Sequence, residues 1–133
     1  MKKIKKISVT IVVGLVLVCA LATSVFASSY SSTLSFNTTL NGAKRYFDGQ
    51  SIGMSMTVNN DGTNASFNAG LWRHYWYGSS FVGSANYYGG WNDNRWSNVG
   101  PGDYNFYFAK NNPDNAAAYN AWFNSNNVYM YNY

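Results

Sequence analysis

Apolar residues recur at every second position in several short stretches of this chain, the spacing that puts side chains on alternating faces of a β-strand. In residues 33–40, Leu34, Phe36 and Leu40 fall on one side and polar residues fall on the other. This alternation predicts a half-buried strand over 33–40.

The most extended pattern covers residues 52–71 and contains a change of parity. Apolar residues occupy even positions up to Val58 and odd positions from Ala65 onward, on either side of the turn-forming segment NNDG at 59–62. A four-residue loop explains the change, because it places Val58 opposite Thr63 and puts both apolar sets on one face. The sequence therefore predicts a β-hairpin over 52–71.

Three further strands are expected toward the C-terminus. One covers 81–88, with Gly83 as a bulge, and one lies in the segment GPGDYNFYFAK at 100–110. The last is NVYMYNY at 127–133, which again alternates. Between the first two, the segment GGWNDNRW at 89–96 predicts a turn-rich connection. Within 100–110, the residues expected to face the core are Tyr104, Phe106 and Phe108.

One segment, NNPDNAAAYNAWF at 111–123, favours one or two helical turns, because Pro113 and Asp114 suit a first turn and alanines follow. Six or seven short strands and no long helix predict an all-β fold, a single small antiparallel β-sandwich or barrel. No internal repeat or linker indicates a second domain.

The first 27 residues have the pattern of a secretory signal peptide. Lysines precede a largely apolar stretch at 7–21, and Val25 and Ala27 put small residues at the two recognition positions of a signal peptidase. We expect cleavage after Ala27, secretion, and one mature domain over 28–133. A retained membrane anchor is the alternative, but its apolar core is shorter than the roughly 20 residues of a spanning helix.

The charge balance changes when this segment is set aside. Lys2, Lys3, Lys5 and Lys6 supply four of the nine basic residues, and the remaining five are matched by five aspartates. A near-neutral domain has little electrostatic attraction for phosphates, so a nucleic-acid partner is not expected. Cys19, the only cysteine, leaves with the signal, so packing of the abundant aromatic residues must replace disulfides.

The predicted mature domain is poorly supplied with catalytic residues. It has no glutamate, no cysteine, one histidine (His74) and no G-x-S-x-G motif. The segments NNDGTN and WNDNRW lack the ligand spacing of a calcium loop, and asparagine and aspartate are ordinary turn residues. We therefore expect a non-enzymatic protein without a metal or another cofactor.

The segment LWRHYWYG at 71–78 is the candidate site. If odd positions up to Leu71 face the core, the alternation puts Trp72, His74 and Trp76 together on the opposite face. The same alternation predicts exposed tyrosines on two other strands. The predicted ligand-binding residues are Trp72, Arg73, His74, Trp76, Tyr107, Tyr129 and Tyr131.

Two alternatives hide this face. A bulge at Gly70 or Gly78 would turn Trp72 or Trp76 inward. The segment around Trp122 would also conceal the rings if it folded over the sheet.

Aromatic rings bordered by amides and charges suit sugars, whose apolar faces stack on rings while their hydroxyls take hydrogen bonds. The first hypothesis is a secreted recognition domain for a cell-surface or extracellular polysaccharide or a surface protein.

Two other functional readings stay open. In its export signal, small size, lack of mature cysteine and abundance of Gly, Asn, Tyr and Trp, the chain resembles lactococcin-972-type bacteriocins. That resemblance implies a small β-sandwich with antimicrobial activity, and it is the one reading that predicts membrane contact. A third reading is a self-assembling matrix protein, because NVYMYNY is uncharged, β-prone and free of proline.

Overall fold

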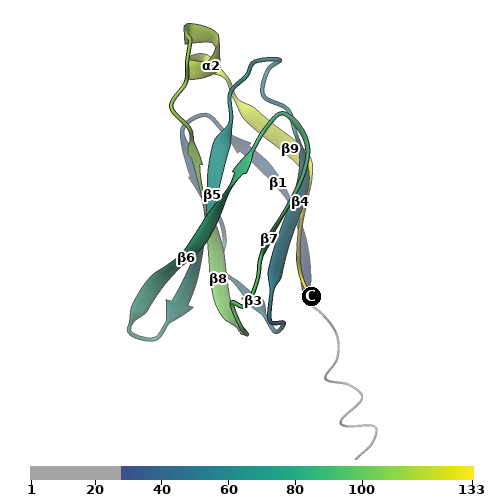
Figure 1. Cartoon of the computed structure of the whole chain (residues 1–133), viewed down its shortest axis with the longest axis vertical. Coiled ribbons are helices and arrows are strands. Elements are labelled where there is room, and N and C mark those ends of the chain that lie inside the picture. Colours follow the sequence, from purple (N-terminus) through teal and green to yellow (C-terminus); the bar gives the residue numbers. More distant parts are fainter. Residues whose placement is uncertain (1–27) are drawn as a thin grey trace, which may run out of the picture.

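The computed structural model describes residues 28–133, so the predicted signal peptide, its cleavage site and Cys19 lie outside the described residues. In the described part, nine strands and one short helix form two antiparallel sheets packed face to face (Figure 1). The predicted all-β sandwich is confirmed, with more strands than the six or seven expected. Both sheets and the hydrophobic core are built from residues 28–133.

The strands divide into two sheets of four and five members. Sheet A has the order β1 (Ser29–Phe36), β9 (Phe123–Asn132), β4 (Ile52–Val58) and β7 (Gly90–Trp96). Sheet B has the order β2 (Thr39–Asn41), β8 (Gly102–Lys110), β5 (Phe67–Tyr75) and β6 (Gly78–Tyr87), and β3 (Arg45–Phe47) also pairs with β8. Helix α2 (Ala116–Asn120) lies at one end of the sandwich (Figure 1).

The core between the sheets is largely aromatic. Phe67 is fully buried and stacks on Tyr87, with ring centroids 5.3 Å apart and planes 3° from parallel. Phe36 and Phe123 meet the Phe67 ring edge-on, with centroids 5.2 and 4.9 Å from its centroid. Each fully buried side chain of this size contributes about 1.5–3 kcal/mol. The predicted core positions Tyr104, Phe106 and Phe108 are confirmed, since all three are buried.

The predicted hairpin over 52–71 is wrong, although its buried faces are right. β4 pairs with β7 and β9 in sheet A, whereas β5 pairs with β6 and β8 in sheet B. The segment between them crosses from one sheet to the other, and the Asn60 amide fixes its turn by donating to the carbonyls of Thr63 and Ala65. Both apolar sets face one core from opposite sides, so their alternation is the same in a hairpin and in a crossover.

Two other boundaries differ from the sequence prediction. The predicted strand over 33–40 is two strands, because β1 ends at Phe36 and β2 begins at Thr39 in the other sheet. The alternation continues through this crossover because both sheets face the same core. The segment 89–96, expected to be a connection, contains β7, in which Trp96 is buried whereas Trp91, Asp93 and Arg95 are exposed.

The expected helical turns and the C-terminal strand are confirmed as α2 and β9. The side chain of Asn115 caps the helix by accepting a hydrogen bond from Ala118 N–H at 2.9 Å. Strand β9 is an inner strand with β1 on one side and β4 on the other. Its residues from Tyr129 to Tyr131 are therefore paired on both sides within the sheet.

Candidate functional site

The outer face of sheet B holds the main group of predicted site residues. Along β5, the fully buried Ala69 and Leu71 point into the core. Trp72 and His74 are partly exposed and line a trough on the other side of the sheet. The alternation expected beyond Leu71 is thus confirmed up to His74.

A bulge does occur beside these residues, but it lies in the neighbouring strand β6. Leu71 pairs with Gly83 and Trp72 pairs with Phe81, so Val82 is the extra residue. The bulge therefore adjoins Gly83, as predicted, and it brings Phe81 to the face of Trp72. The two rings meet edge-on with centroids 5.3 Å apart, which supports the indole from one side.

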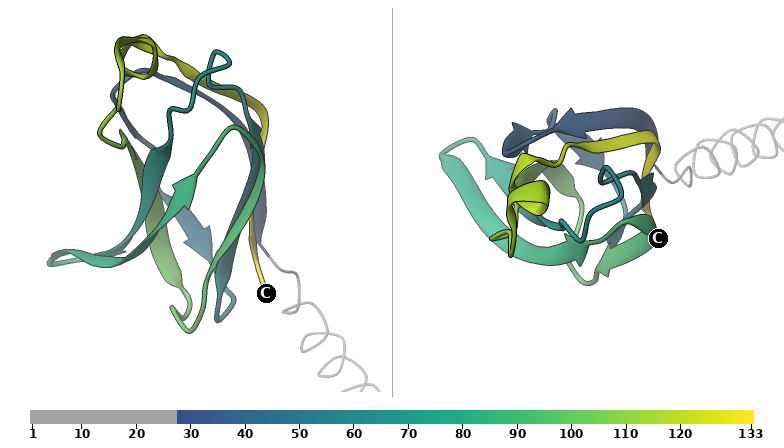
Figure 2. Two further views of the ribbon diagram at one scale, coloured as in Figure 1. Left: turned by 45° about the horizontal axis from the view of Figure 1, so that its top comes forward. Right: turned by 90° about the horizontal axis from the view of Figure 1, so that it is seen from above.

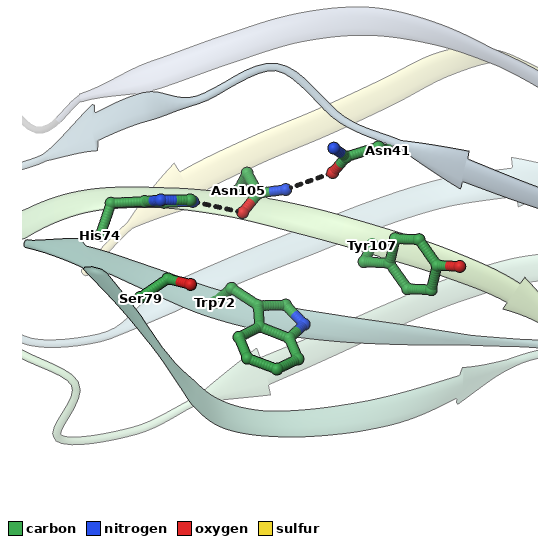
Figure 3. A pocket seen from close by; sticks show the side chains of 6 residues that line it. All are labelled: Asn41, Trp72, His74, Ser79, Asn105 and Tyr107. Atoms are coloured by element: carbon green, nitrogen blue, oxygen red, sulfur yellow. Dashed lines mark hydrogen bonds between the residues drawn. The ribbon is translucent and has the colours of Figure 1, made fainter.

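The trough is an open groove of about 350 Å³ on this face (Figure 3). Its volume is at the lower end of the range of small-ligand sites, about 300–1,000 Å³. Four neighbouring strands, β2, β5, β6 and β8, supply its lining residues. These residues are Asn41, Trp72, His74, Ser79, Asn105 and Tyr107.

A chain of two short hydrogen bonds crosses the floor of the trough (Figure 3). His74 Nε2 lies 2.6 Å from Asn105 Oδ1, and Asn105 Nδ2 donates to Asn41 Oδ1 at 2.6 Å. The same Nδ2 faces the carbonyl of Gly42 at 3.4 Å, which fixes the orientation of the Asn105 amide. His74 Nε2 must therefore carry the proton of this bond.

This arrangement leaves two polar atoms of the lining residues without a partner. Within residues 28–133, His74 Nδ1 and Asn41 Nδ2 have no hydrogen-bond partner in the protein. One is an acceptor in the neutral imidazole and the other is a donor. Asn105, which positions the His74 and Asn41 side chains, is only 8% exposed and is itself held by packing.

His74 also stands between Asp103 and Ser79, its cross-strand neighbours on β8 and β6. These three residues have the composition of a catalytic triad. In the described structure, however, the hydrogen bond of the imidazole goes to the amide of Asn105 and none joins it to Asp103 or Ser79. A general base needs an oriented nucleophile within hydrogen-bond reach, and His74 makes no hydrogen bond of this kind among the described residues.

Two predicted site residues in or just after β5 lie outside the trough. Arg73 points to the other side of the sheet, where Nη1 donates to Val99 O at 2.9 Å and Nη2 to Pro101 O at 2.6 Å. It is one position out of phase with its neighbours Trp72 and His74. Trp76 belongs to the turn after β5, where strand alternation has ended.

Tyr129 and Tyr131 are on the outer face of sheet A, on the opposite side of the sandwich from the trough. Their rings stack with centroids 5.6 Å apart, and the Tyr131 hydroxyl donates to Asp93 Oδ1 at 2.6 Å. Burial, followed by the bond to Asp93, raises the pKa of the Tyr131 hydroxyl above its ordinary value. Five of the predicted site residues therefore lie on two separate surfaces: Trp72, His74 and Tyr107 line the trough, and Tyr129 and Tyr131 lie on sheet A.

The sequence prediction missed three lining residues. Asn105 could have been found from Tyr107, because residues two apart on a strand share a face. Ser79 follows once the turn after β5 is recognised as two residues long, since it then pairs with His74. Asn41 depends on the crossover into β2, and no periodic pattern marks it.

Among residues 28–133, no three side chains of His, Cys, Asp or Glu come together to hold a metal ion. In the same part of the chain, no helix has the length and apolar character needed to span a bilayer.

Comparisons with known proteins add little to this description. No family profile matches the chain, and no curated protein matches it. Among solved structures, it is similar to a chain of the "Structure of infectious bursal disease virus Gx strain" with a TM-score of 0.41 and 12% identity. The match covers 80% of this chain and 32% of that chain, and a likeness of this degree carries no functional argument.

Proposed function

We propose that this protein is a secreted, non-enzymatic recognition domain that binds a cell-surface or extracellular polysaccharide in the trough of sheet B. The observation that carries the proposal is the combination of Trp72 and Tyr107 with the line of oriented side chains from His74 to Asn41. Export is supported by the signal-peptide pattern of residues 1–27.

The two rings supply the apolar part of such a site. Trp72 is braced by Phe81, and Tyr107 is partly exposed on the neighbouring strand β8. Gly70, which pairs with Tyr107, has no side chain, and this lets the Phe81 and Trp72 rings lie close over the strand. Sugar rings present C–H faces that pack on aromatic side chains, which makes an open groove with exposed rings suitable for them.

The polar groups supply the hydroxyl contacts. A hydroxyl group both donates and accepts, and the trough offers a donor at Asn41 Nδ2 and an acceptor at His74 Nδ1. Because Asn105 already holds both side chains in place, binding orders few additional rotamers, which reduces its entropic cost.

The charge of the lining narrows the ligand class. No lysine or arginine lines the trough, and Arg73 is directed to the other side of the sheet. The one acidic neighbour, Asp103, would repel an anion. These features favour an uncharged glycan over a phosphorylated or uronic-acid polymer.

The proposal is tested with residues 28–133 by titration with soluble oligosaccharides and by pull-down on insoluble polysaccharides, with tryptophan fluorescence as readout. Replacing Trp72 with Ala should lower the affinity about 10- to 100-fold, because roughly 1.4–2.8 kcal/mol of stacking is lost. The matched control is Trp91→Ala, since Trp91 is 65% exposed on β7 of the other sheet. It should bind as the parent does.

Circular dichroism and urea unfolding should show that Trp72→Ala is folded. If no uncharged glycan in a broad panel binds the parent domain, or if Trp91→Ala weakens binding as much as Trp72→Ala, the trough is not a glycan site.

A further inference from the structure

The turn between β5 and β6 carries three exposed aromatic rings. Tyr75 pairs with Gly78, so Trp76 and Tyr77 form a two-residue turn. Tyr75, Trp76 and Tyr77, here called the tip, are 38%, 96% and 68% exposed. The hairpin that carries them extends beyond the body of the sandwich in both views of Figure 2.

The rings of the tip pack against one another. Tyr75 and Tyr77 stack with centroids 5.1 Å apart and planes 6° from parallel, and Trp76 meets Tyr77 edge-on at 5.3 Å. The Arg73 guanidinium lies 5.1 Å from the centroid of the Tyr75 ring. Since the carbonyls of the neighbouring loop hold that guanidinium, the tip rests on a fixed support.

The chemistry of the tip fits the boundary of a lipid bilayer. Indole and phenol rings combine an apolar body with an N–H or O–H donor, and Trp and Tyr are enriched where hydrocarbon meets headgroups. No charged residue occurs from Tyr75 to Val82, and the Arg73 guanidinium beside Tyr75 is bonded to the carbonyls of Val99 and Pro101. Exposed apolar surface costs about 25 cal/mol per Å², a cost that insertion removes.

The size of the tip argues against a protein as the main partner. Three aromatic rings bury at most about 450–750 Å² together. A stable protein interface covers about 800 Å² on each partner, in complementary shape. A narrow turn provides little flat area beyond its rings, whereas a bilayer requires no complementary surface.

We propose that the tip is a membrane anchor that places Tyr75, Trp76 and Tyr77 in the headgroup region of a phospholipid bilayer. Because it carries no basic residue, it should bind zwitterionic lipid, and binding should be insensitive to salt. Trp76 lies outside the trough, so membrane binding and glycan binding can be tested separately.

The experiment uses residues 28–133 and vesicles of phosphatidylcholine alone, with cosedimentation as the measure of binding. The parent should partition to the vesicles equally at about 0.1 and 0.5 M salt, a range that shortens the screening length about twofold. Trp76→Ala should lower the partition coefficient about tenfold, which corresponds to about 1.4 kcal/mol of lost burial of the indole ring in the bilayer. Trp91→Ala is the matched control and should bind as the parent does.

Vesicles containing brominated phosphatidylcholine should quench the tryptophan emission of the parent and of Trp91→Ala, and should quench Trp76→Ala much less. Trp76→Ala should also keep the parent's urea unfolding midpoint, because its ring has no core contact. The anchor is rejected if the parent stays in solution, if both variants bind equally, or if binding requires anionic lipid and disappears in salt.

Discussion

Asp48 accepts three hydrogen bonds on one carboxylate oxygen. Ser28 donates from its backbone nitrogen at 3.2 Å and from its hydroxyl at 3.1 Å, and the Asn132 amide donates the third. The bond from Ser28 N–H is the largest cause that lowers the pKa of Asp48 below its ordinary value. These contacts join the start of β1 to the end of β9. In a chain cleaved after Ala27, as the sequence predicts, the Ser28 nitrogen is an α-ammonium group, which adds a favourable charge to the same contact.

Because folding lowers the pKa of Asp48, the contact should stabilise the protein above the ordinary Asp value of 3.8. This stability is lost as the pH falls through the folded-state pKa. Urea unfolding between pH 6 and 2 should therefore show a loss of unfolding free energy at acid pH that is smaller in Asp48→Asn. The control, Asp114→Asn at an exposed position, should follow the parent curve. If all three proteins lose the same unfolding free energy at acid pH, Asp48 has no such role.

At the scale of elements, one glycine sets the packing of the tyrosine face of sheet A. Gly53 on β4 lies directly under the ring of Tyr131 on β9, and the two residues are cross-strand partners. A Cβ atom at position 53 would lie 2.3 Å from Cζ of Tyr131, which is too close for any side chain. Glycine in a strand commonly marks such a close approach. The missing side chain lets the Tyr131 ring lie flat and its hydroxyl reach Asp93.

Gly53→Ala should therefore displace the Tyr131 ring and break its hydrogen bond to Asp93. Because the Tyr131 ring is partly exposed and can shift, the loss of this bond should cost about 1 kcal/mol of unfolding free energy, measured by urea denaturation. The control is Gly83→Ala, where the new Cβ would lie 3.4 Å from the Trp96 ring, an ordinary contact distance. If Gly53→Ala is as stable as this control, the ring does not depend on the glycine.

The strands also show which features of the fold could be predicted from the sequence. The faces of Leu71, Trp72 and Tyr107 were predictable, because the core imposes alternation on each strand separately. Strand partners were not predictable, because β4 and β5 present identical patterns whether they form a hairpin or face each other across the core. The aromatic residues of the trough could therefore be predicted from alternation. Asn41 could not, because the crossover that brings it into sheet B leaves no periodic signal.

At the scale of the whole molecule, Arg73 helps to close one end of the sandwich. The loop between β7 of sheet A and β8 of sheet B offers the carbonyls of Val99 and Pro101 to its guanidinium. The same loop donates from Val99 N and Gly100 N to Gln50 O, just before β4 of sheet A, at 2.8 and 3.1 Å. Arg73 on β5 and Gln50 thus hold one loop from the two sheets.

Arg73→Met keeps the aliphatic stem but removes both donors. It should lower the unfolding free energy by about 2 kcal/mol, because hydrogen bonds from a charged donor are worth about 1.5–3 kcal/mol and this group is partly exposed. Hydrogen exchange at the Val99 and Gly100 amides should also become faster. Arg95→Met is the control, since the Arg95 side chain is 57% exposed, and it should change little. Unchanged exchange in Arg73→Met would show that the loop is held without Arg73.

The central place of β9 in sheet A also determines when the chain can fold. Strand β1 has no neighbour in its sheet except β9, and Ser29 pairs with Tyr131 near the opposite end of the polypeptide. A hairpin such as β5–β6 closes locally, but β1 must wait for the final segment, and such distant pairing slows folding. A polypeptide that has emerged only as far as β8 therefore lacks the residues that finish sheet A. Strand β1 can take its native place only after β9 has emerged.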